Sequence, residues 1–228
     1  MKIITLNTWG GRAGKEGLLS FASEYKNSID VFCFQEIWSA PYEHLDGHDA
    51  GGNKINNEET MVYGMQEISG LLSNHKSYFH PHHLDNYGLM MSVSKDIFVE
   101  EEGEVFVHKH KGYVPTGDVG RHARNLSYIK TSFSDKPLTI INFHGLWNGM
   151  GKGDSDERLV QSRNIINLLK TLEGEILFCG DFNLLPETES LKMFEDFGLR
   201  NNTALLLRVL HTTRSRRSSL IIYSSQKA

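Results

Sequence analysis

The stretch ILFCGDFN, residues 176–183, joins a run of apolar residues to a cluster of polar ones. Its first part is short, rich in large apolar side chains and bounded by Gly180, which is typical of a buried β-strand. Its second part places Asp181 and Asn183 directly after that strand, on backbone rigid enough to hold side chains in a fixed geometry. Alone, Asp181 and Asn183 are equally typical of a plain turn, so their function depends on what the chain brings beside them.

Similar apolar runs recur along the whole chain. They predict strands at Lys2–Leu6, Val31–Gln35, Tyr87–Ser94, Ile97–His108, Asn125–Phe133, Leu138–His144 and Ile176–Gly180. Helical spacing predicts helices near 61–72 and 159–172, with shorter ones at Gly17–Tyr25 and Ser190–Phe197. Segment 39–59 has no period and is predicted to be a long surface loop. Many strands without strict β-α-β alternation predict a layered, mixed α/β domain with antiparallel pairing.

The composition excludes several classes of protein. The chain has 228 residues and a formal net charge of −4, so it can bury a core without disulfides or structural metal. No apolar run reaches the roughly 18 residues that a membrane span needs, so stable membrane insertion is not expected. Cys33 and Cys179 both lie in apolar runs, which is typical of buried thiols in a reducing compartment. We therefore expect a cytoplasmic protein, and a monomer.

Three other predicted strands also end in polar residues. The first runs into Asn7, the second into Glu36, and a later one delivers His144. Carboxylate and amide oxygens suit Mg²⁺ or Mn²⁺, which bind through one or two carboxylates together with waters and substrate phosphate. A second carboxylate would orient the attacking water, and an imidazolium would stabilise developing negative charge. The implied chemistry is hydrolysis of a phosphoester.

Four motifs occur in order along the chain: LNTW at 6–9, FQE at 34–36, NFHGL at 142–146 and GDFN at 180–183. Together they resemble the endonuclease/exonuclease/phosphatase superfamily, and the resemblance runs from residue 1 to about residue 203. It implies a four-layer α/β sandwich of two packed, mostly antiparallel mixed sheets. It also implies a divalent-metal phosphodiesterase or phosphatase site at one edge.

The resemblance carries roles over to individual residues. Glu36 is similar to the principal metal ligand of the superfamily, with Asn7 supporting the metal or the phosphate beside it. His144 is similar to the histidine that contacts the scissile phosphate and can act as an acid. Asp181 is similar to the carboxylate that positions the nucleophilic water, and Asn183 to the amide that binds phosphate next to it.

Further substrate-contacting residues are predicted with alternatives left open. Arg121 resembles a phosphate-contacting arginine, and Arg124 competes with it for that role. Asn142, in the histidine motif, is predicted to contact substrate. Trp147 follows that motif and is predicted to line the substrate pocket, although tryptophan is as commonly part of the core.

The C-terminal end departs from the superfamily pattern. Members close the site with Ser-Asp-His, whose histidine is usually the general base, yet this chain contains no Asp-His dipeptide. Residues 204–228 carry five basic and no acidic residues, whereas residues 1–203 carry 19 basic and all 28 acidic ones. One hypothesis is that 204–228 is an atypical basic tail produced by a truncated or out-of-frame end, following a family-like domain at 1–203. It predicts that residues beyond about 205 pack poorly, supply no site ligand and leave the terminal strands incomplete.

Two functions therefore compete. One is a divalent-metal-dependent phosphoesterase acting on a phosphodiester or phosphomonoester, with nucleic acid or a phospholipid head group as candidate substrates. The other is a non-enzymatic phosphate-ligand binding module that lacks the general-base histidine, since losing that base removes a factor of about 10²–10⁴ in rate. The acidic body argues against tight binding to long duplex DNA, which requires clustered Lys and Arg.

A group of histidines between residues 75 and 83 invites a metal interpretation. His75, His80, His82 and His83 lack a matched second pair of ligands, and they flank the turn-like Pro81. A solvated or loop position is therefore predicted for them in preference to a metal site.

Overall fold

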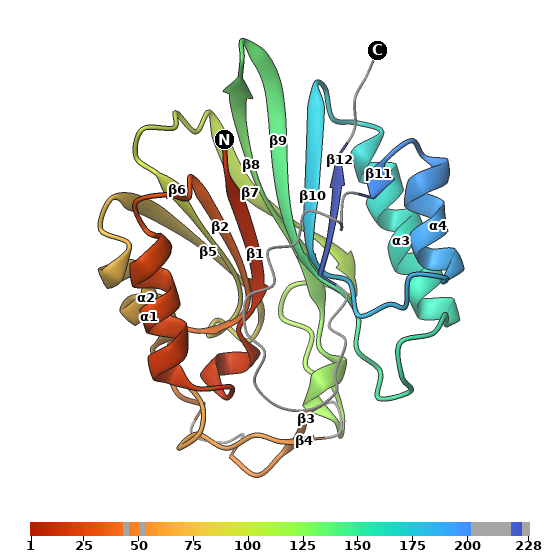
Figure 1. Ribbon diagram of the computed structural model, residues 1–228. Coiled ribbons are helices and arrows are strands. Elements are labelled where there is room, and N and C mark those ends of the chain that lie inside the picture. Colours follow the sequence, from red (N-terminus) through yellow and green to blue (C-terminus); the bar gives the residue numbers. More distant parts are fainter. Residues whose placement is uncertain (43–45, 51–52, 202–219, 225–228) are drawn as a thin grey trace.

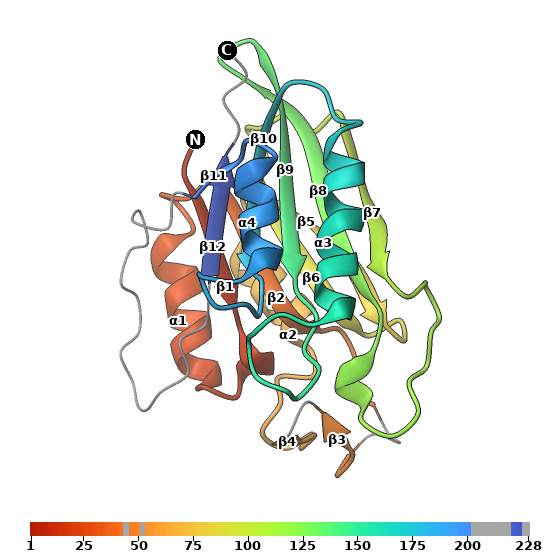
Figure 2. The ribbon, with the colours of Figure 1, turned by 90° about the vertical axis from the view of Figure 1, so that its right-hand side faces the viewer.

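Two β-sheets pack against each other in the computed structural model, and helices cover both outer faces (Figures 1 and 2). The structure describes residues 1–42, 46–50, 53–201 and 220–224. Helices α1 and α2 lie on the outside of the first sheet, and α3 and α4 lie on the outside of the second (Figure 1). The predicted four-layer α/β sandwich is confirmed.

The elements follow one another in this order: β1 (Ile3–Asn7), η1 (Trp9–Gly11), α1 (Lys15–Tyr25), β2 (Val31–Trp38), β3 (Asp49–Ala50), β4 (Asn53–Lys54), α2 (Gly64–Leu71), β5 (His75–His83), β6 (Tyr87–Ser94), β7 (Glu101–His108), η2 (Val119–Arg121), β8 (Arg124–Phe133), β9 (Lys136–His144), α3 (Asp156–Leu169), β10 (Glu175–Asp181), α4 (Glu189–Asp196), β11 (Arg200–Asn201) and β12 (Leu220–Ser224). The first sheet has the strand order β1-β2-β6-β5, and the second has β11-β12-β10-β9-β8-β7. Among the strands that the structure describes, β1–β2 and β9–β10 pair in parallel and the other pairs are antiparallel. None of the described helices is long and apolar enough to span a bilayer.

Three apolar clusters hold the layers together. Phe32, Phe34 and Ile68 are fully buried where α1 and α2 meet the first sheet. Phe143, Phe178, Phe182 and Phe194 fill the space between the second sheet and its helices, with tilted and edge-to-face ring contacts. Between the sheets lies a third cluster that contains both cysteines, each 0% exposed, so the prediction that they are buried is confirmed.

The segment at 75–83 forms a strand rather than a solvated loop. β5 pairs with β6 along its whole length, and His75, His82 and His83 are all buried. The prediction failed because Pro81 suggested a turn. β5 is an edge strand, where a missing proline N–H on the open side breaks no ladder bond, and a register shift follows Pro81 directly.

Part of the basic tail lies in the second sheet. β12 pairs antiparallel with β10, with Leu220 opposite Asp181 and Ser224 opposite Leu177. Residues 202–219 and 225–228 lie outside the described residues, as do the side chains of 220–224. The prediction that the tail packs poorly and supplies no site ligand therefore falls largely outside the described part of the chain.

Candidate active site

Four strand ends meet at one edge of the sandwich, as the motifs predict. Parallel pairing places Asn7 opposite Gln35 at the end of β1 and β2, and Asp181 opposite His144 at the end of β9 and β10. The two pairs belong to different sheets, and a hydrogen bond from Asn7 to Asp181 joins them. The site is therefore built across the interface between the sheets.

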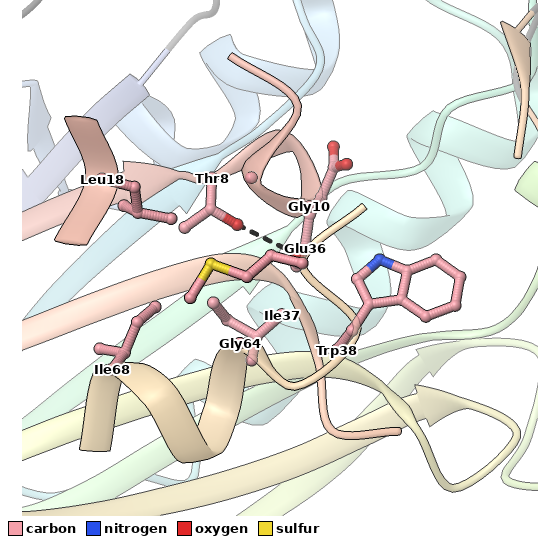
Figure 3. Close-up of a pocket in the computed structure, with 10 residues that line it drawn as sticks. Thr8, Gly10, Leu18, Glu36, Ile37, Trp38, Gly64 and Ile68 are labelled. Atoms are coloured by element: carbon pink, nitrogen blue, oxygen red, sulfur yellow. Dashed lines mark hydrogen bonds between the residues drawn. The ribbon is translucent and has the colours of Figure 1, made fainter. Parts of the chain in front are cut away.

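A β-bulge aims Glu36 into the site. The β2–β6 register shifts between Phe34 and Ile37, and Glu36 adopts a φ of 60°, a strained value for a non-glycine residue. The Thr8 hydroxyl stabilises this turn by donating to the main-chain carbonyl of Glu36 at 3.1 Å (Figure 3). In Figure 3 the Glu36 carboxylate points away from the apolar side chains of Leu18 and Ile68.

Asn7 bridges two carboxylates, that of buried Asp181 and that of the partly exposed Glu36. Its Nδ2 donates to Glu36 Oε1 and to Asp181 Oδ2, both at 2.9 Å, and its Oδ1 accepts the Trp9 main-chain N–H at 2.9 Å. Burial raises the pKa of Glu36, and the nearby charge of Asp181 raises it further, while the hydrogen bond from Asn7 opposes both effects. The Asn7 amide thus holds the two carboxylates close together.

Asn183 completes this half of the site. Its main-chain N–H donates to Asp181 Oδ1 at 2.9 Å, and its Nδ2 donates to the Gly145 carbonyl at 3.2 Å. Its φ of 54° is again left-handed. We call Asn7, Glu36, Asp181 and Asn183 the carboxylate side of the site.

Two glycines allow the strand ends to approach this closely. Gly180 has a φ of 148°, and a Cβ there would overlap the carbonyl oxygen of Phe143. A Cβ at Gly145 would overlap the carbonyl oxygen of Phe182. Because no other residue fits either position, the glycines of the two motifs set the spacing between His144 and Asp181.

His144 lies opposite the carboxylates and is held by Arg124. Arg124 Nη1 lies 3.2 Å from His144 Nδ1, and since a guanidinium can only donate, Nδ1 accepts and the ring proton sits on Nε2. His144 Nε2 lies 3.7 Å from Glu36 Oε1. Burial, and then the charge of Arg124, hold the pKa of His144 well below its usual range. His144 is therefore a neutral N–H donor here, where an imidazolium was expected.

Arg124, rather than Arg121, belongs to the cluster. Arg124 is 2% exposed, donates from Nη2 to the Gly120 carbonyl at 3.2 Å, and carries its charge close to Glu36 and Asp181. Arg121 lies on η2 with its side chain exposed. Of the two arginines left open by the sequence, the structure places Arg124 beside His144.

Asn142 does not reach the surface of the site. It is 0% exposed, its Oδ1 accepts from Gln35 Nε2 at 2.6 Å, and its Nδ2 donates to the Phe34 carbonyl at 2.9 Å. Since its amide is fully engaged between the sheets, Asn142 ties β9 to β2 and is not placed to contact substrate. Trp147 is half-buried in the loop that follows His144.

Tyr87 and two further histidines also belong to the site, and the sequence did not reveal them. The Tyr87 hydroxyl is hydrogen-bonded to Glu36, and burial, followed by the charge of Glu36, raises its pKa. Tyr87 packs edge-on against His82 and His122, with ring centroids 5.4 Å apart in both pairs. A third histidine, His83, stacks on His122, and we call His82, His83, His122 and Arg124 the imidazole side. His82 and Tyr87 lie on neighbouring strands, β5 and β6, so no pattern within one strand could have indicated them.

The donor set fits a hard divalent cation. Two carboxylates that face each other carry a mutual repulsion that such a cation would relieve. Among the described residues, no group of three or more His, Cys, Asp and Glu is arranged to hold a metal. The two carboxylates are the protein ligands that Mg²⁺ or Mn²⁺ can use, since these ions take their other ligands from water and substrate.

Comparisons with known proteins agree with this geometry. The model of the Endonuclease/Exonuclease/phosphatase family matches residues 4–221, and the chain belongs to this family. The match extends into the basic tail and includes the first residues of β12. No curated protein matches the chain.

Solved structures share the fold at low sequence identity. An endonuclease/exonuclease/phosphatase family protein from Leptotrichia buccalis is 15% identical with a TM-score of 0.63, covering 99% of this chain and 88% of that one. A Bacteroides thetaiotaomicron mannosyl-6-phosphatase is 13% identical with a TM-score of 0.64, covering 98% and 84%. Truncated TDP2 from Caenorhabditis elegans is 15% identical with a TM-score of 0.60, covering 99% and 83%. These likenesses establish the fold.

Proposed function

We propose that this protein is a divalent-metal-dependent hydrolase of phosphoesters. One observation carries the proposal: the Asn7 amide bridges the carboxylates of Glu36 and Asp181, 2.9 Å from each, at an edge that also holds His144. Paired carboxylates facing donors of positive character form a site for a phosphoryl group together with its cation. Membership of a family of nucleases and phosphatases supports the same chemistry.

The carboxylate side would hold the cation and the attacking water. We assign Glu36 as the principal ligand of Mg²⁺ or Mn²⁺, because its carboxylate is more accessible to solvent than that of Asp181. The Glu36 side chain is 20% exposed. When bound, the cation supplies Lewis-acid polarisation of a phosphoryl oxygen. Asp181 orients the water. Asn7 offers its nitrogen rather than its oxygen to the carboxylates, so it sets their spacing instead of ligating the metal.

His144 and Arg124, which lie across the site from the carboxylates, would bind the phosphate. His144 presents Nε2–H, and Arg124 supplies the positive charge close to both carboxylates. Such fixed donors stabilise the charge that develops on phosphoryl oxygens in the transition state. Asn183 lies beside Asp181 and faces the phosphate from the other strand end, while Trp147 is assigned to the outer, substrate-facing rim.

The charge of the protein bears on the substrate class. The acidic body disfavours long duplex DNA, so we propose a small phosphodiester or phosphomonoester, such as a short nucleic-acid end, a phosphosugar or a phospholipid head group. The phosphatase among the similar structures supports the phosphomonoester reading. The buried free cysteines support a cytoplasmic location.

A non-catalytic phosphate-binding module is the second candidate. The absence of any Asp-His dipeptide from the sequence favours it, because the expected general base is missing. It predicts that phosphate ligands bind in the presence of cation but are never hydrolysed.

Turnover assays separate the two functions. The purified chain would be incubated with bis(p-nitrophenyl) phosphate, p-nitrophenyl phosphate, mannose 6-phosphate, a single-stranded oligonucleotide and sphingomyelin, with Mg²⁺, with Mn²⁺ and with EDTA. The hydrolase proposal predicts release of product that requires a cation. Binding of phosphate without turnover on every substrate would contradict it and favour the binding module.

A further inference from the structure

The turn that follows β1 buries its two glycines and exposes its tryptophan. Gly10 and Gly11 of η1 are buried, whereas Trp9 is 45% exposed. The chain has three tryptophans, and Trp38 is only 6% exposed. A single exposed apolar residue needs no explanation by itself. Trp9 does, because its exposure coincides with a strained backbone and with a place beside Asn7.

The backbone of Trp9 is held in a conformation that tryptophan rarely adopts. Its φ of 48° lies in the left-handed region, which is unfavourable for a bulky side chain. Backbone strain of this kind persists only where the surroundings impose it, and it gathers at functional sites. Glycine or asparagine would adopt the same backbone at a lower cost in free energy. The shape of the turn therefore does not explain why a tryptophan stands here.

Packing on the glycine side of the turn leaves the indole ring on the solvent side. A Cβ on Gly10 would lie 3.1 Å from Trp38 Nε1, and a Cβ on Gly11 would lie 2.7 Å from Met61 Cβ. The glycine side of η1 therefore lies directly against the buried residues Trp38 and Met61, with no room for a further side chain. The exposed ring of Trp9 cannot turn inward into this part of the core.

Hydrogen bonds connect the Trp9 backbone to the carboxylates of the site. The main-chain N–H of Trp9 donates to Asn7 Oδ1 at 2.9 Å. The Nδ2 of the same amide donates to Glu36 and to Asp181. Two hydrogen bonds therefore separate the Trp9 main chain from each carboxylate, and the exposed ring is attached at the rim of the candidate active site. A group that is part of a bound phosphoester can reach it.

A single exposed indole ring is suited to a flat aromatic partner. Trp38 packs against the rings of Tyr42 and Tyr87, whereas no ring contact of Trp9 occurs in the described part of the chain. Quaternary ammonium groups are typically bound in cages made of several aromatic rings, and Trp9 is not part of one. Stacking of one planar ring on another needs only one face, and its contribution is about 1–3 kcal/mol for a nucleobase on an aromatic side chain.

We propose that Trp9 is a specificity-determining residue that stacks on a planar aromatic group of the phosphoester, such as an unpaired nucleobase; this rests on the phosphate site of the proposed function. Base faces inside a duplex are covered by neighbouring bases, so the base must be that of a mononucleotide or of a frayed strand end. The acidic body of the protein disfavours long duplex DNA for an independent reason. Trp9 contributes affinity for the aromatic group and takes no part in the chemical step.

Two ligands that differ only in the base test the proposal. They are the phosphonate analogues of thymidine 5′-monophosphate and of 2-deoxyribose 5-phosphate, in which a carbon replaces the ester oxygen so that neither can be hydrolysed. Isothermal titration calorimetry with Mg²⁺ measures both dissociation constants. The wild type is expected to bind the thymidine analogue about 5–150-fold more tightly, the ratio that one stacked base supplies.

Three variants assign this ratio to the ring. Trp9→Asn removes the ring but suits a left-handed backbone, and it should lower the ratio to about twofold or less while the deoxyribose analogue binds within about threefold of wild type. Trp9→Tyr keeps an aromatic face and should keep the ratio within about threefold of wild type. Phe98→Asn is the matched control, because Phe98 is a 78% exposed aromatic residue between β6 and β7, at the opposite edge of the sheet, and its ratio should not change.

Each contrary result has a defined meaning. Equal affinity of the wild type for the two analogues overturns the proposal, and so does a Trp9→Asn variant that keeps the wild-type ratio. A Trp9→Asn variant that loses affinity for both analogues equally also overturns it, since Trp9 would then support the site and not recognise the base. A wild type that binds neither analogue overturns the phosphate site and this inference with it. Base-selective binding without turnover in the assays above overturns the hydrolase alone and upholds the role of Trp9.

Discussion

The two sides of the site differ in how completely their polar atoms are satisfied. On the carboxylate side, Asn7 and Asp181 have each side-chain oxygen or nitrogen bonded within the protein. On the imidazole side, His82, His83 and Arg124 keep buried nitrogens with no partner among the described residues. On the carboxylate side, hydrogen bonds within the protein are therefore sufficient to hold the Asn7 and Asp181 side chains in place. The imidazole side keeps buried nitrogens whose hydrogen-bonding capacity the described residues do not use.

The two sides also differ in how they are built. The carboxylate side comes from the ends of β1 and β10 and from the bulge in β2, which lie in both sheets. The imidazole side is assembled from the end of β5, the residue after η2 and the start of β8. Three predictions follow the difference between the sides, beginning with the largest of the three effects.

Arg124 connects the two sides and is expected to show the largest effect. Arg124→Gln removes the donor to His144 Nδ1 and the charge beside both carboxylates, so we expect kcat/KM to fall by about 10²–10³-fold. Arg121→Gln is the matched control because its side chain is exposed on η2, and it should change kcat/KM by less than about threefold. Steady-state kinetics on both variants decide between the arginines. Equal losses, or a larger loss for Arg121→Gln, would contradict the assignment.

The carboxylate side depends on close backbone contact at Gly180. Gly180→Ala adds a Cβ against the Phe143 carbonyl at a φ of 148°, and we expect the free energy of unfolding to drop by about 3 kcal/mol. Gly153→Ala is the control, since no atom lies within 4 Å of its Cβ position, and it should stay within about 0.5 kcal/mol of the wild type. Urea unfolding of the three proteins measures both values. A Gly180→Ala protein as stable as the control would show that the strand ends are not held as described.

The imidazole side should make stability depend on pH. Burial, and then Arg124, lower the pKa of His83 to about 4, while an unfolded histidine titrates near 6.5. The unfolded chain therefore binds more protons in this window, and stability falls as pH falls from about 6.5 towards 4. Each such histidine lowers the free energy of unfolding by about 0.7 kcal/mol when the pH falls from 7 to 6.

His83→Gln tests this dependence directly. Urea unfolding would measure the free energy of unfolding of wild type and variant at pH 7 and at pH 6. The decrease in this free energy from pH 7 to pH 6 should be smaller in the variant by about 0.7 kcal/mol. His110→Gln, on an exposed residue, serves as the control and should keep the wild-type dependence. An unchanged pH dependence in His83→Gln would mean that His83 is not held neutral in the fold.

The carboxylate side could be predicted from sequence because its information is local. A buried apolar run followed by Asp181 and Asn183 is visible within eight residues, and the repetition of the same arrangement at Asn7 and Glu36 made convergence predictable. The sequence did not indicate that Asn142 lies buried between the sheets and not at the surface of the site. It shares a face of β9 with His144 but lies two residues earlier, so the neighbouring sheet covers it.

The imidazole side could not be predicted because no local pattern defines it. His82 lies beyond Pro81 in a segment typical of a loop, and its burial depends on β5 forming the edge of a sheet completed by β6. The neutrality of His144 depends on Arg124, a residue 20 positions away that reaches it only through β8–β9 pairing. Tertiary contacts of this kind decide protonation states, and composition or spacing does not report them.

The central claim is that the Asn7-bridged carboxylates form a metal-dependent centre for phosphoester hydrolysis. Its most direct test is hydrolysis of bis(p-nitrophenyl) phosphate and p-nitrophenyl phosphate by the wild type and by Glu36→Gln, each with Mg²⁺, with Mn²⁺ and with EDTA. The account predicts cation-dependent turnover by the wild type, abolished by EDTA and reduced about 10³-fold in Glu36→Gln, the equivalent of several kcal/mol of charge stabilisation. Glu189→Gln, on an exposed residue of α4, should leave turnover unchanged. Turnover that survives EDTA, or that is equal in wild type and Glu36→Gln, would contradict the claim.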